Sequence, residues 1–439
     1  MADPVHDREP GGVVRRLARM AANLVYRDID VQLPHDPVGQ GPMLAVANHF
    51  GGLADGVLLV DTAPRRPRIV ARDVIWKIPL VGRLATAAGM IPVHRAADGG
   101  GRASNDQMFA SAYTSLADGD LVLIFPEGVT MDVPHMAEVR TGAARIALGA
   151  RESGVRGLRI LPVGVHYEDK AAFRSRALVN IGEPIPLDAW VDSRGPVIGG
   201  ADDRQAVVEL TALIDQRLRL VAPNYPDWDQ AHALETAAGV LLTDVDPGAP
   251  PPVGYGDLAL LGSRLNRLPE PARTELVSAG AEYRQALHGS RTTDHAVATA
   301  ADPVRSWGWL VDVALVALLL PFAAMGLLVS LIPLALVLVA SRLRIAPAVR
   351  ATVVPGLATL LFLIEWGLVA FSRGEDGSLE FGLLSAVLFP FLVAAMLFVA
   401  ERVSVLWLRW RRRRRPRAEE LSRLQALRSA VAEKGWAAL

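Results

Sequence analysis

The sequence predicts an α/β protein in which a mixed, mostly parallel sheet is flanked by helices and followed by an all-α C-terminal membrane region. Between residues 42 and 190, short apolar runs alternate with stretches of helical spacing. A Pro/Gly-rich segment at 246–257 then interrupts the pattern. Beyond it, the last third of the chain contains long apolar segments of membrane-spanning character.

Composition excludes several classes of protein. The 439 residues include 46 basic and 46 acidic side chains, so net charge gives no reason to expect a nucleic-acid partner. Cysteine is absent, which excludes a disulfide framework, thiolate catalysis and cysteine-ligated metal. The nine histidines show no metal-ligand spacing, and no P-loop is found. We therefore expect no metal, no cofactor and no nucleotide hydrolysis.

The first region contains five apolar runs that predict strands buried on both faces. They are 42–47, 68–72, 90–94, 121–125 and 159–165. Helical spacing is found at 105–119, 141–154 and 205–221, and the first two of these stretches end at a glycine, as helices often do. This alternation is typical of a mostly parallel sheet covered by helices.

Residues 12–27 predict an amphipathic helix. Its apolar face consists of Val13, Leu17, Met20, Ala21 and Leu24, with Arg15, Arg16 and Arg19 beside it. Such a helix can lie on an anionic membrane surface or pack on its own domain, and packing is favoured. The chain start lacks the basic-then-apolar order of a signal peptide.

Three apolar segments predict the membrane region, at 313–340, 351–371 and 381–400. About 20 residues suffice to cross a bilayer, and the last two segments fit that length. The first is longer and contains Pro321 and Pro333. We expect it to form a re-entrant hairpin that enters and leaves on one side.

Loop charges predict the orientation of these segments. Residues 341–350 and 409–417 are basic, and 372–380 are mostly acidic. Positive loops stay in the cytosol, so the two basic loops are expected inside and the acidic one outside. The arginine run also suits nucleic acid, but its position after a spanning helix favours anionic lipid headgroups. We therefore expect a multi-pass protein of the cell (inner) membrane with a cytoplasmic catalytic domain.

The predicted organisation has five parts. They are an N-terminal helix and lead-in (1–40), a catalytic domain (41–225), a linker and helical connector (226–300), the membrane region (301–410) and a basic cytosolic tail (411–439).

The stretch VANHFGGLAD, residues 46–55, contains the strongest candidates for chemistry, His49 and Asp55. A neutral imidazole can take a proton from an alcohol, and a carboxylate on its other nitrogen fixes the tautomer and stabilises the imidazolium. Taken alone, the pair also fits a loop histidine and a helix N-cap. No Ser or Cys nucleophile accompanies it, so the substrate's own alcohol is the expected nucleophile.

Three further blocks follow in order: GMIPVHR (89–95), IFPEGVT (124–130) and ILPVGVHY (160–167). With the first block they resemble the glycerolphosphate acyltransferase superfamily over about residues 40–190. The resemblance implies that His49 is the base and Asp55 the orienting acid, and that Arg95 holds the acceptor's phosphate. It implies that Glu127 and Gly128 help to place the glycerol headgroup and that Pro162 lies on the acyl-donor side. Asn48 and Arg140 complete the expected substrate-binding set.

One feature departs from the usual family pattern, because five residues separate His49 from Asp55 where four are usual. The stretch is more similar to a branch with the pattern N-H-P-N-x-x-x-D, which includes fungal-type glycerol-3-phosphate acyltransferases and often has an apolar C-terminal region. RTGAARIA (140–147) also resembles that branch. Gly51 and Gly52 can adopt turns closed to other residues, so we expect the extra residue to loop out and leave the pair in contact.

The resemblance implies an O-acyltransferase of phospholipid biosynthesis. Its donor would be acyl-CoA or acyl carrier protein, and its acceptor lysophosphatidic acid, glycerol 3-phosphate or another lysolipid. A thioester is already activated, so a base and oxyanion stabilisation suffice for the reaction. Two alternatives stay open: an acyl-thioester hydrolase, and a non-catalytic membrane scaffold with a degenerate site.

Overall fold

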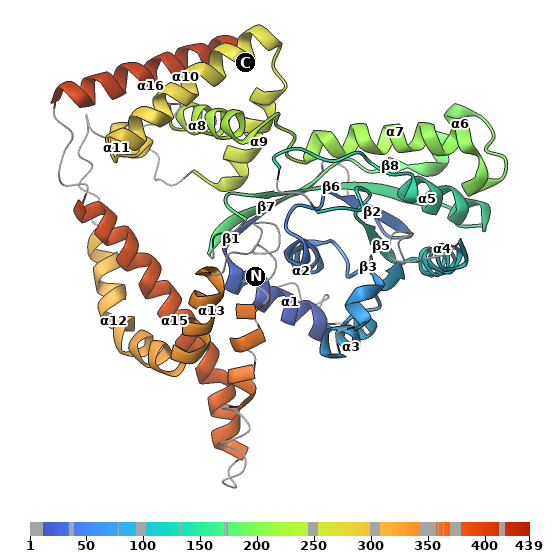
Figure 1. Cartoon of the computed structure of the whole chain (residues 1–439), viewed down its shortest axis with the longest axis horizontal. Coiled ribbons are helices and arrows are strands. Elements are labelled where there is room, and N and C mark those ends of the chain that lie inside the picture. Colours follow the sequence, from blue (N-terminus) through green and yellow to red (C-terminus); the bar gives the residue numbers. More distant parts are fainter. Residues whose placement is uncertain are drawn as a thin grey trace. The chain divides into compact units, whose positions relative to one another are not determined.

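The computed structural model describes residues 12–34, 39–77, 79–93, 102–130, 133–170, 172, 174–244, 253–298, 308–342, 357–358, 360–362, 364–368, 379–411 and 418–439. The chain forms two compact units (Figure 1). The first runs to Trp228 and includes Gly254–Ala259, and the second contains most of the C-terminal helices.

In the described part of the first unit, eight strands form one sheet in the order β1-β7-β6-β2-β5-β3-β4, with β8 paired to β6. The strands are β1 (Tyr26–Gln32), β2 (Met43–Ala47), β3 (Pro67–Arg72), β4 (Ile91–Val93), β5 (Leu121–Ile124), β6 (Arg159–Tyr167), β7 (Ser175–Ile181) and β8 (Ile185–Pro186). The five predicted strands correspond to β2, β3, β4, β5 and β6.

The centre of the sheet is parallel. Strand β2 pairs in parallel with β5 on one side and β6 on the other, and β3 continues the parallel set between β5 and β4. Strands β7 and β8 run antiparallel to β6, and β1 runs parallel to β7. The predicted fold class, a mixed and mostly parallel sheet followed by a helical C-terminal region, is therefore confirmed. Carboxyl ends of β2, β3, β4, β5 and β6 share one edge.

Helices cover both faces of this sheet. They are α1 (Gly12–Val25), α2 (Leu53–Thr62), α3 (Pro79–Ala87), α4 (Arg102–Ala117), α5 (Gly142–Glu152), α6 (Leu187–Arg194) and α7 (Arg204–Val221), with 3₁₀ turns at Asp73–Lys77 and Gly200–Asp202. Figure 1 shows α5 and α7 on one face and α1 and α2 on the other.

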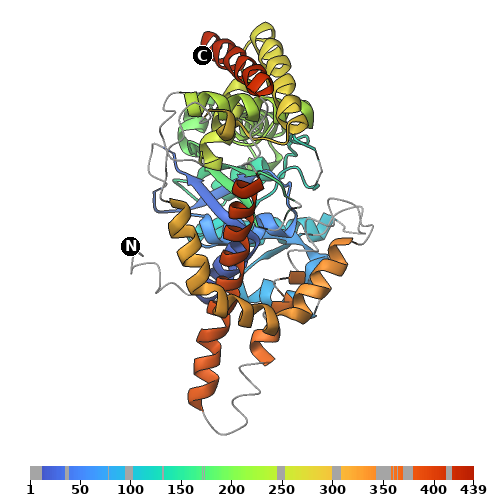
Figure 2. The ribbon, with the colours of Figure 1, turned by 90° about the vertical axis from the view of Figure 1, so that its left-hand side faces the viewer.

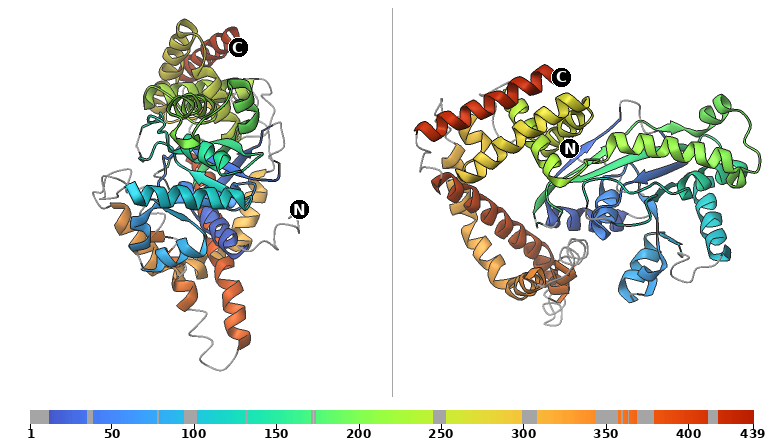
Figure 3. Two further views of the ribbon diagram at one scale, coloured as in Figure 1. Left: turned by 90° about the vertical axis from the view of Figure 1, so that its right-hand side faces the viewer. Right: turned by 45° about the horizontal axis from the view of Figure 1, so that its top comes forward.

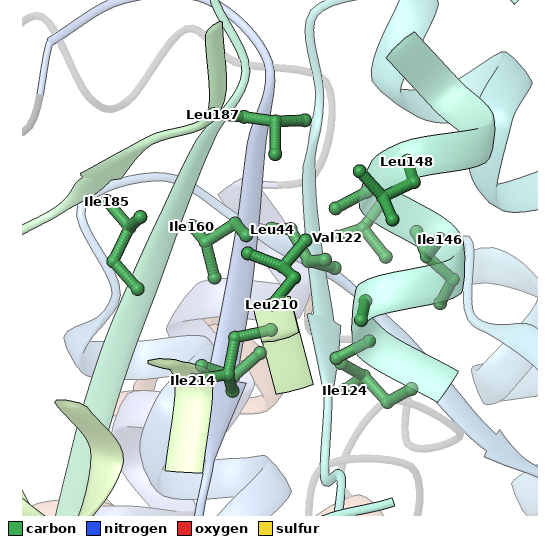
Figure 4. Packing of buried hydrophobic residues seen from close by; sticks show 14 of the residues in the cluster. Leu44, Val122, Ile124, Ile146, Leu148, Ile160, Ile185, Leu187, Leu210 and Ile214 are labelled. Atoms are coloured by element: carbon green, nitrogen blue, oxygen red, sulfur yellow. The ribbon is translucent and has the colours of Figure 1, made fainter. Parts of the chain in front are cut away.

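Alternate residues of each central strand face opposite layers. Leu44 of β2, Val122 of β5 and Ile160 of β6 point into the cluster under α5 and α7. Figure 4 shows these side chains packed with Ile146, Leu148, Leu210 and Ile214 from the two helices. The intervening residues of the same strands, such as Ala45 and Leu161, pack under α2. Burial on both faces explains why these strands are continuous apolar runs in the sequence.

Helix α1 packs on its own domain, but through a different face from the predicted one. Val14 and Ala18 contact the cluster under α2, while Leu17 and Met20 stay 38% and 40% exposed. Arg15 donates hydrogen bonds to the carbonyls of Asp61 (3.0 Å) and Ala63 (2.8 Å) at the end of α2. The small side chains allow a close approach, and the arginine satisfies carbonyls left without partners at the helix end.

The end of α7 is attached to β6 by a buried histidine. His166 Nε2 donates to the carbonyl of Val221 at 2.6 Å, and Asn180 of β7 donates to the same oxygen at 3.2 Å. A Cβ at Gly164 would lie 2.0 Å from that oxygen, so only glycine permits this approach. Burial lowers the pKa of His166 to about 4, so it stays neutral in the folded protein.

The second unit contains a helical bundle. Its helices are α8 (Trp228–Asp244), α10 (Glu270–Gly289), α11 (Asp294–Ala298) and α16 (Ala418–Ala438), and α9 (Tyr255–Asn266) precedes α10. Figure 2 shows α16 lying beside α10. Arg428 of α16 bonds to Asp294 at 3.0 Å and to Asp244 at 3.3 Å. Tyr283 donates to Asp294 at 2.8 Å, so one network joins all four helices of the bundle.

The apolar part of the second unit includes α12 (Gly308–Val329), α13 (Leu331–Arg342) and α15 (Leu379–Arg411). Figure 3 shows α12 and α15 side by side. They are antiparallel, because Asp312 pairs with Arg402 at 2.9 Å and a Cβ at Gly326 would lie 2.3 Å from the carbonyl oxygen of Leu392. The two helices therefore touch at backbone distance, an approach that a small residue permits.

Among the described residues, one helix is long and apolar enough to cross a membrane, Leu310–Val329 within α12. This helix continues through Pro321 to Val329, and α13 begins two residues before Pro333. The break in the predicted hairpin segment 313–340 thus lies at Ser330. The predicted span 381–400 lies within α15, and most of the predicted loops 341–350 and 372–380 lie outside the described residues. The multi-pass arrangement stays a prediction.

The buried His166 predicts that the first unit loses stability in mild acid. Its folded-state pKa, about 4, lies below the ordinary value of 6.5, so the unfolded chain binds the proton first as pH falls. This contribution is complete above the ordinary value and is lost as pH falls toward 4. We expect it to lower the free energy of unfolding by about 1 kcal/mol at pH 5.5 relative to pH 7.5. Urea unfolding at both pH values should show a smaller pH difference for His166→Gln than for the unmodified protein.

Candidate functional site

The candidate site lies at the edge where the parallel strands end. His49 follows β2 by two residues, Glu127 follows β5 by three, and Tyr167 is the last residue of β6. Because β2 lies between β5 and β6 and runs parallel to both, these three side chains meet at one edge. The carboxyl edge of a parallel sheet is where α/β proteins usually bind ligands.

His49 and Asp55 are in contact. The imidazole Nδ1 lies 2.8 Å from Asp55 Oδ2. The histidine side chain is 21% exposed and the aspartate fully buried. Because a carboxylate can only accept this bond, Nδ1 carries the hydrogen and Nε2 keeps a lone pair. His49 therefore has the tautomer that a general base needs.

Asp55 has two further donors. It lies in the first turn of α2, and the N–H of Gly51 bonds to its two oxygens at 3.0 and 2.9 Å. The hydroxyl of Tyr167 donates to Asp55 Oδ1. A Cβ at Gly51 would lie 2.7 Å from that oxygen and 2.8 Å from the Tyr167 hydroxyl. The glycine thus lets the five-residue connection turn back and bond the same carboxylate that orients His49.

Two contacts fix the position of His49. Its ring stacks on Phe125, with ring centroids 4.2 Å apart and an interplanar angle of 23°. Its backbone N–H donates to Glu127 Oε1 at 2.8 Å. Backbone and ring are therefore both held, which leaves Nε2 as the ring nitrogen available for a substrate.

Glu127, expected to help place the glycerol headgroup, is 1% exposed and bonds to the protein itself. Its second oxygen accepts the N–H of Ala137 at 2.7 Å, while the first accepts that of His49. Burial raises the pKa of Glu127, and the two backbone donors oppose this shift. In this arrangement the carboxylate braces the loop of His49 against the segment that follows β5.

Asn48, also expected to bind substrate, is fully buried. Its amide nitrogen donates to the carbonyl of Val165 at 3.0 Å, and its oxygen accepts the N–H of Val165 at 2.7 Å. The Asn48 side chain therefore extends the backbone hydrogen bonding between β2 and β6 beyond the end of β2. It places the next residue, His49, beside β6.

Gly128 and Arg140 lie together beside the turn after β5. Gly128 donates its N–H to the carbonyl of Phe125 at 3.1 Å and has a φ of +64°, which favours glycine. Arg140 is exposed, its N–H bonds to the carbonyl of Pro126 at 3.0 Å, and its Cδ would lie 3.6 Å from a Cβ at Gly128. Its guanidinium forms no hydrogen bond within the part of the chain that the structure describes.

Arg95 lies outside the described residues. It follows the last residue of β4, Val93, by two positions, and β4 ends at the same edge as β2. Lys170 is a cationic side chain at this edge that the structure does describe. Its Nζ lies 3.5 Å from the carbonyl oxygen of Phe50. The described ranges contain no group of three or more His, Asp or Glu side chains that could hold a metal ion.

Sequence reasoning did not single out Phe125, Tyr26 or Tyr167. Tyr26, the first residue of β1, stacks on Tyr167 with ring centroids 5.6 Å apart. Burial raises the pKa of both tyrosines, and the negative charge of Asp55 raises it further. Tyr167 was within the quoted fourth block. Its place at the end of a strand parallel to β2 was the signal that could have revealed it.

Residues 28–166 match the family model described as Acyltransferase. This range contains the central parallel strands and most of the residues of the site, including His49, Asp55 and Glu127. This part of the first unit is therefore similar to the acyltransferase family.

The curated relatives agree with this family. The chain is 33% identical over 134 residues to glycerol-3-phosphate O-acyltransferase 2 of Saccharomyces cerevisiae and 28% identical over 149 residues to glycerol-3-phosphate O-acyltransferase 1 of the same yeast. These matches cover 30% and 33% of this chain but only 18% and 19% of the yeast proteins. The chain thus matches less than a fifth of the length of these relatives.

A solved structure is also similar, the 1-acyl-sn-glycerophosphate acyltransferase PlsC from Thermotoga maritima. The two chains are 18% identical with a TM-score of 0.33, and the match covers 48% of this chain and 84% of the other. That score is too low to inform the site.

The crowding at Gly51 predicts that a single methyl group disrupts the site. Gly51→Ala places its Cβ against Asp55 and Tyr167, so we expect the free energy of unfolding to fall by about 1–3 kcal/mol. Gly56→Ala, within the helix α2 that follows, is the matched control, because its Cβ would meet only Ile69 Cδ1 at 3.6 Å. Chemical denaturation of the two variants should separate them, and equal stabilities would contradict the packing described here.

Proposed function

We propose that this protein is a membrane-associated O-acyltransferase of phospholipid biosynthesis. It moves a fatty acyl group from a thioester of coenzyme A or acyl carrier protein to the hydroxyl of a glycerophosphate or lysophospholipid. The observation that carries the proposal is the His49–Asp55 contact at the carboxyl edge of the sheet. The family match of residues 28–166 supports the same chemistry.

His49 acts as the general base in this proposal. Nε2 takes the proton of the acceptor hydroxyl as its oxygen attacks the thioester carbonyl, and Asp55 stabilises the imidazolium. The carbon–sulfur bond then breaks, and the thiolate leaves with the proton that His49 returns. A thioester needs no further activation, so no nucleophile from the protein is required.

The acceptor's phosphate is proposed to bind cations at the same edge. Arg140 supports this role because it is exposed and lies beside the Gly128 turn, next to the residue that braces His49. Arg95 is proposed as the second cation, from its position after β4. A guanidinium suits phosphate because its planar donors can form two parallel bonds. Asn48 and Glu127 are proposed to act through the placement of His49.

We further propose that the apolar region 308–411 holds the enzyme in the cell membrane with its catalytic domain on the cytoplasmic side. The bundle of α8, α10, α11 and α16 supports one part of this arrangement, that both flanks of the apolar region lie on the same side of the membrane. Three of its helices precede the apolar region and α16 follows it, yet Arg428 joins them in one network. Segments that fold together lie on one side of a membrane, so region 308–411 crosses an even number of times.

The antiparallel pair of α12 and α15 supports the same arrangement. Asp312 near the start of α12 meets Arg402 in the C-terminal half of α15, so an ion pair joins the two helices toward one end of the pair. Charged groups inside a bilayer are costly, and an ion pair near the interface reduces that cost. The basic run at 409–417 then lies on the cytoplasmic side, beside anionic headgroups.

The first test is acyl transfer by the purified protein, with one labelled acyl thioester and a panel of glycerol 3-phosphate, lysophosphatidate and other lysolipids. We expect His49→Ala and Asp55→Asn to lower turnover by about 10²–10⁴-fold, the usual contribution of a positioned base. His288→Ala, which removes an exposed histidine of the second unit, is the matched control.

Near-wild-type transfer by His49→Ala would overturn the assignment of the base. Consumption of the thioester at the same rate with and without any acceptor would instead identify a hydrolase. No thioester turnover by the unmodified protein with any acceptor would leave the scaffold alternative.

The second test concerns membrane topology. Because the chain has no cysteine, a single introduced cysteine is the only site that a thiol reagent can label. Single cysteines at Ala298 and Ala418 flank the apolar region, and neither should react with an impermeant reagent until cells are permeabilised. A cysteine at Gly377, in the acidic loop, should react in intact cells. Opposite behaviour at Ala298 and Ala418 would contradict an even number of crossings. Labelling of Ala346→Cys from outside would show that 313–340 crosses the membrane fully.

A further inference from the structure

We infer that Tyr167 is a positioning residue of the acyl-transfer site, whose hydroxyl holds the buried Asp55 carboxylate in the orientation that His49 requires. This inference rests on the proposed function and deepens it. Tyr167 acts through Asp55, because its hydroxyl donates to the carboxylate.

The two carboxylate oxygens of Asp55 have different side-chain donors and share one backbone donor. Oδ2 accepts from the imidazole Nδ1 at 2.8 Å and from the N–H of Gly51 at 2.9 Å. Oδ1 accepts from the Tyr167 hydroxyl and, at 3.0 Å, from the same N–H of Gly51. Without the hydroxyl, Oδ1 would share a single backbone donor with Oδ2, although the carboxylate has no exposure to water.

A buried carboxylate with too few donors is costly, because each missing bond leaves part of its desolvation uncompensated. Such a group can rotate about its Cβ–Cγ bond to share its remaining donors, or exchange its contact with the imidazole for one with water. Either change loosens the hydrogen bond that sets the tautomer of His49. The hydroxyl of Tyr167 removes this freedom because its own position is fixed.

Three observations fix the position of Tyr167. It ends β6, which pairs with β2 on one side and β7 on the other, so its backbone lies within the sheet. Its ring stacks on Tyr26, which is 4% exposed. Gly51 has no side chain, which leaves room for the hydroxyl beside Asp55, because a Cβ there would lie only 2.8 Å from it. Since burial and Asp55 raise the pKa of Tyr167, the phenol stays protonated and remains a donor.

The expected kinetic result is a loss in kcat. Tyr167→Phe keeps the ring and its stacking on Tyr26 but removes the donor. We expect kcat to fall by about 10–100-fold, as for the loss of a group that orients the base, with KM for donor and acceptor nearly unchanged. Tyr113→Phe, on the other face of the sheet, is the matched control, since among the described residues the hydroxyl of Tyr113 donates only to the Arg145 carbonyl, at 3.5 Å.

Rescue separates positioning from general stability. Site-specific incorporation of 3-fluorotyrosine at position 167 restores a hydroxyl donor in a ring of almost the same size, so we expect transfer within about threefold of the unmodified rate. A merely structural ring would make Phe and 3-fluorotyrosine equivalent. Equal kcat values for these two variants would overturn the inference. So would a Tyr167→Phe variant in which kcat and the melting temperature fall while KM rises, because that pattern indicates general loss of structure.

A second readout does not depend on acyl transfer. The proton of His49 Nδ1, hydrogen-bonded to Asp55, should give a low-field proton resonance in NMR spectra of the full-length protein, and His49→Ala identifies it by its loss. We expect Tyr167→Phe to shift or broaden this signal and Tyr113→Phe to leave it unchanged. An unchanged signal in Tyr167→Phe would overturn the inference even if the protein transfers acyl groups. If the unmodified protein transfers none, the proposed function fails while the signal still tests the positioning.

Discussion

A carboxylate with no exposure to water imposes the main constraint on the site, and the surrounding structure supplies what it needs. Asp55 stays buried only because an imidazole, a backbone N–H and a phenol all donate to it. Two of these donors can reach Asp55 only because of a particular feature of the fold. The backbone N–H requires a glycine at position 51, and the phenol requires β6 directly beside β2. The bonds between Asn48 and Val165 then keep those two strands together where the site begins.

The central strands could be predicted from the sequence because they are buried on both faces, so their apolar character is continuous. β2 is an example, since all five of its residues are buried. The edge strand β1 could not be found in this way. Its sequence, YRDIDVQ, is mostly half-buried or exposed, and a strand at the edge of a sheet needs no continuous apolar run. Its partner β7 was missed too, because its antiparallel pairing with β6 departs from the repeating strand–helix pattern.

The candidate site shows a similar division. The contact between His49 and Asp55 was predictable because both lie close in sequence around one turn. The partners of Glu127 and Asn48 were not, because they depend on segments distant in sequence. Glu127 meets the backbone of His49, 78 positions away, and Asn48 meets Val165, 117 positions away. Residue types that suit a substrate equally suit a backbone, and these backbone partners become visible only in the folded chain.

The bundle around Arg428 also has a consequence for the order of assembly during synthesis. Helix α16 follows the apolar region in the chain, so it leaves the ribosome after α8, α10, α11 and that whole region. Until then, Asp294 and Asp244 lack the arginine that joins them, and Leu241 of α8 lacks its contact with Gly435. Closure of the bundle is therefore a late folding event, and in the proposed membrane arrangement a chain whose apolar helices left α16 on the other side of the membrane could not complete it. Under that proposal, only correctly inserted chains could complete the bundle, which would make its folding a check on insertion.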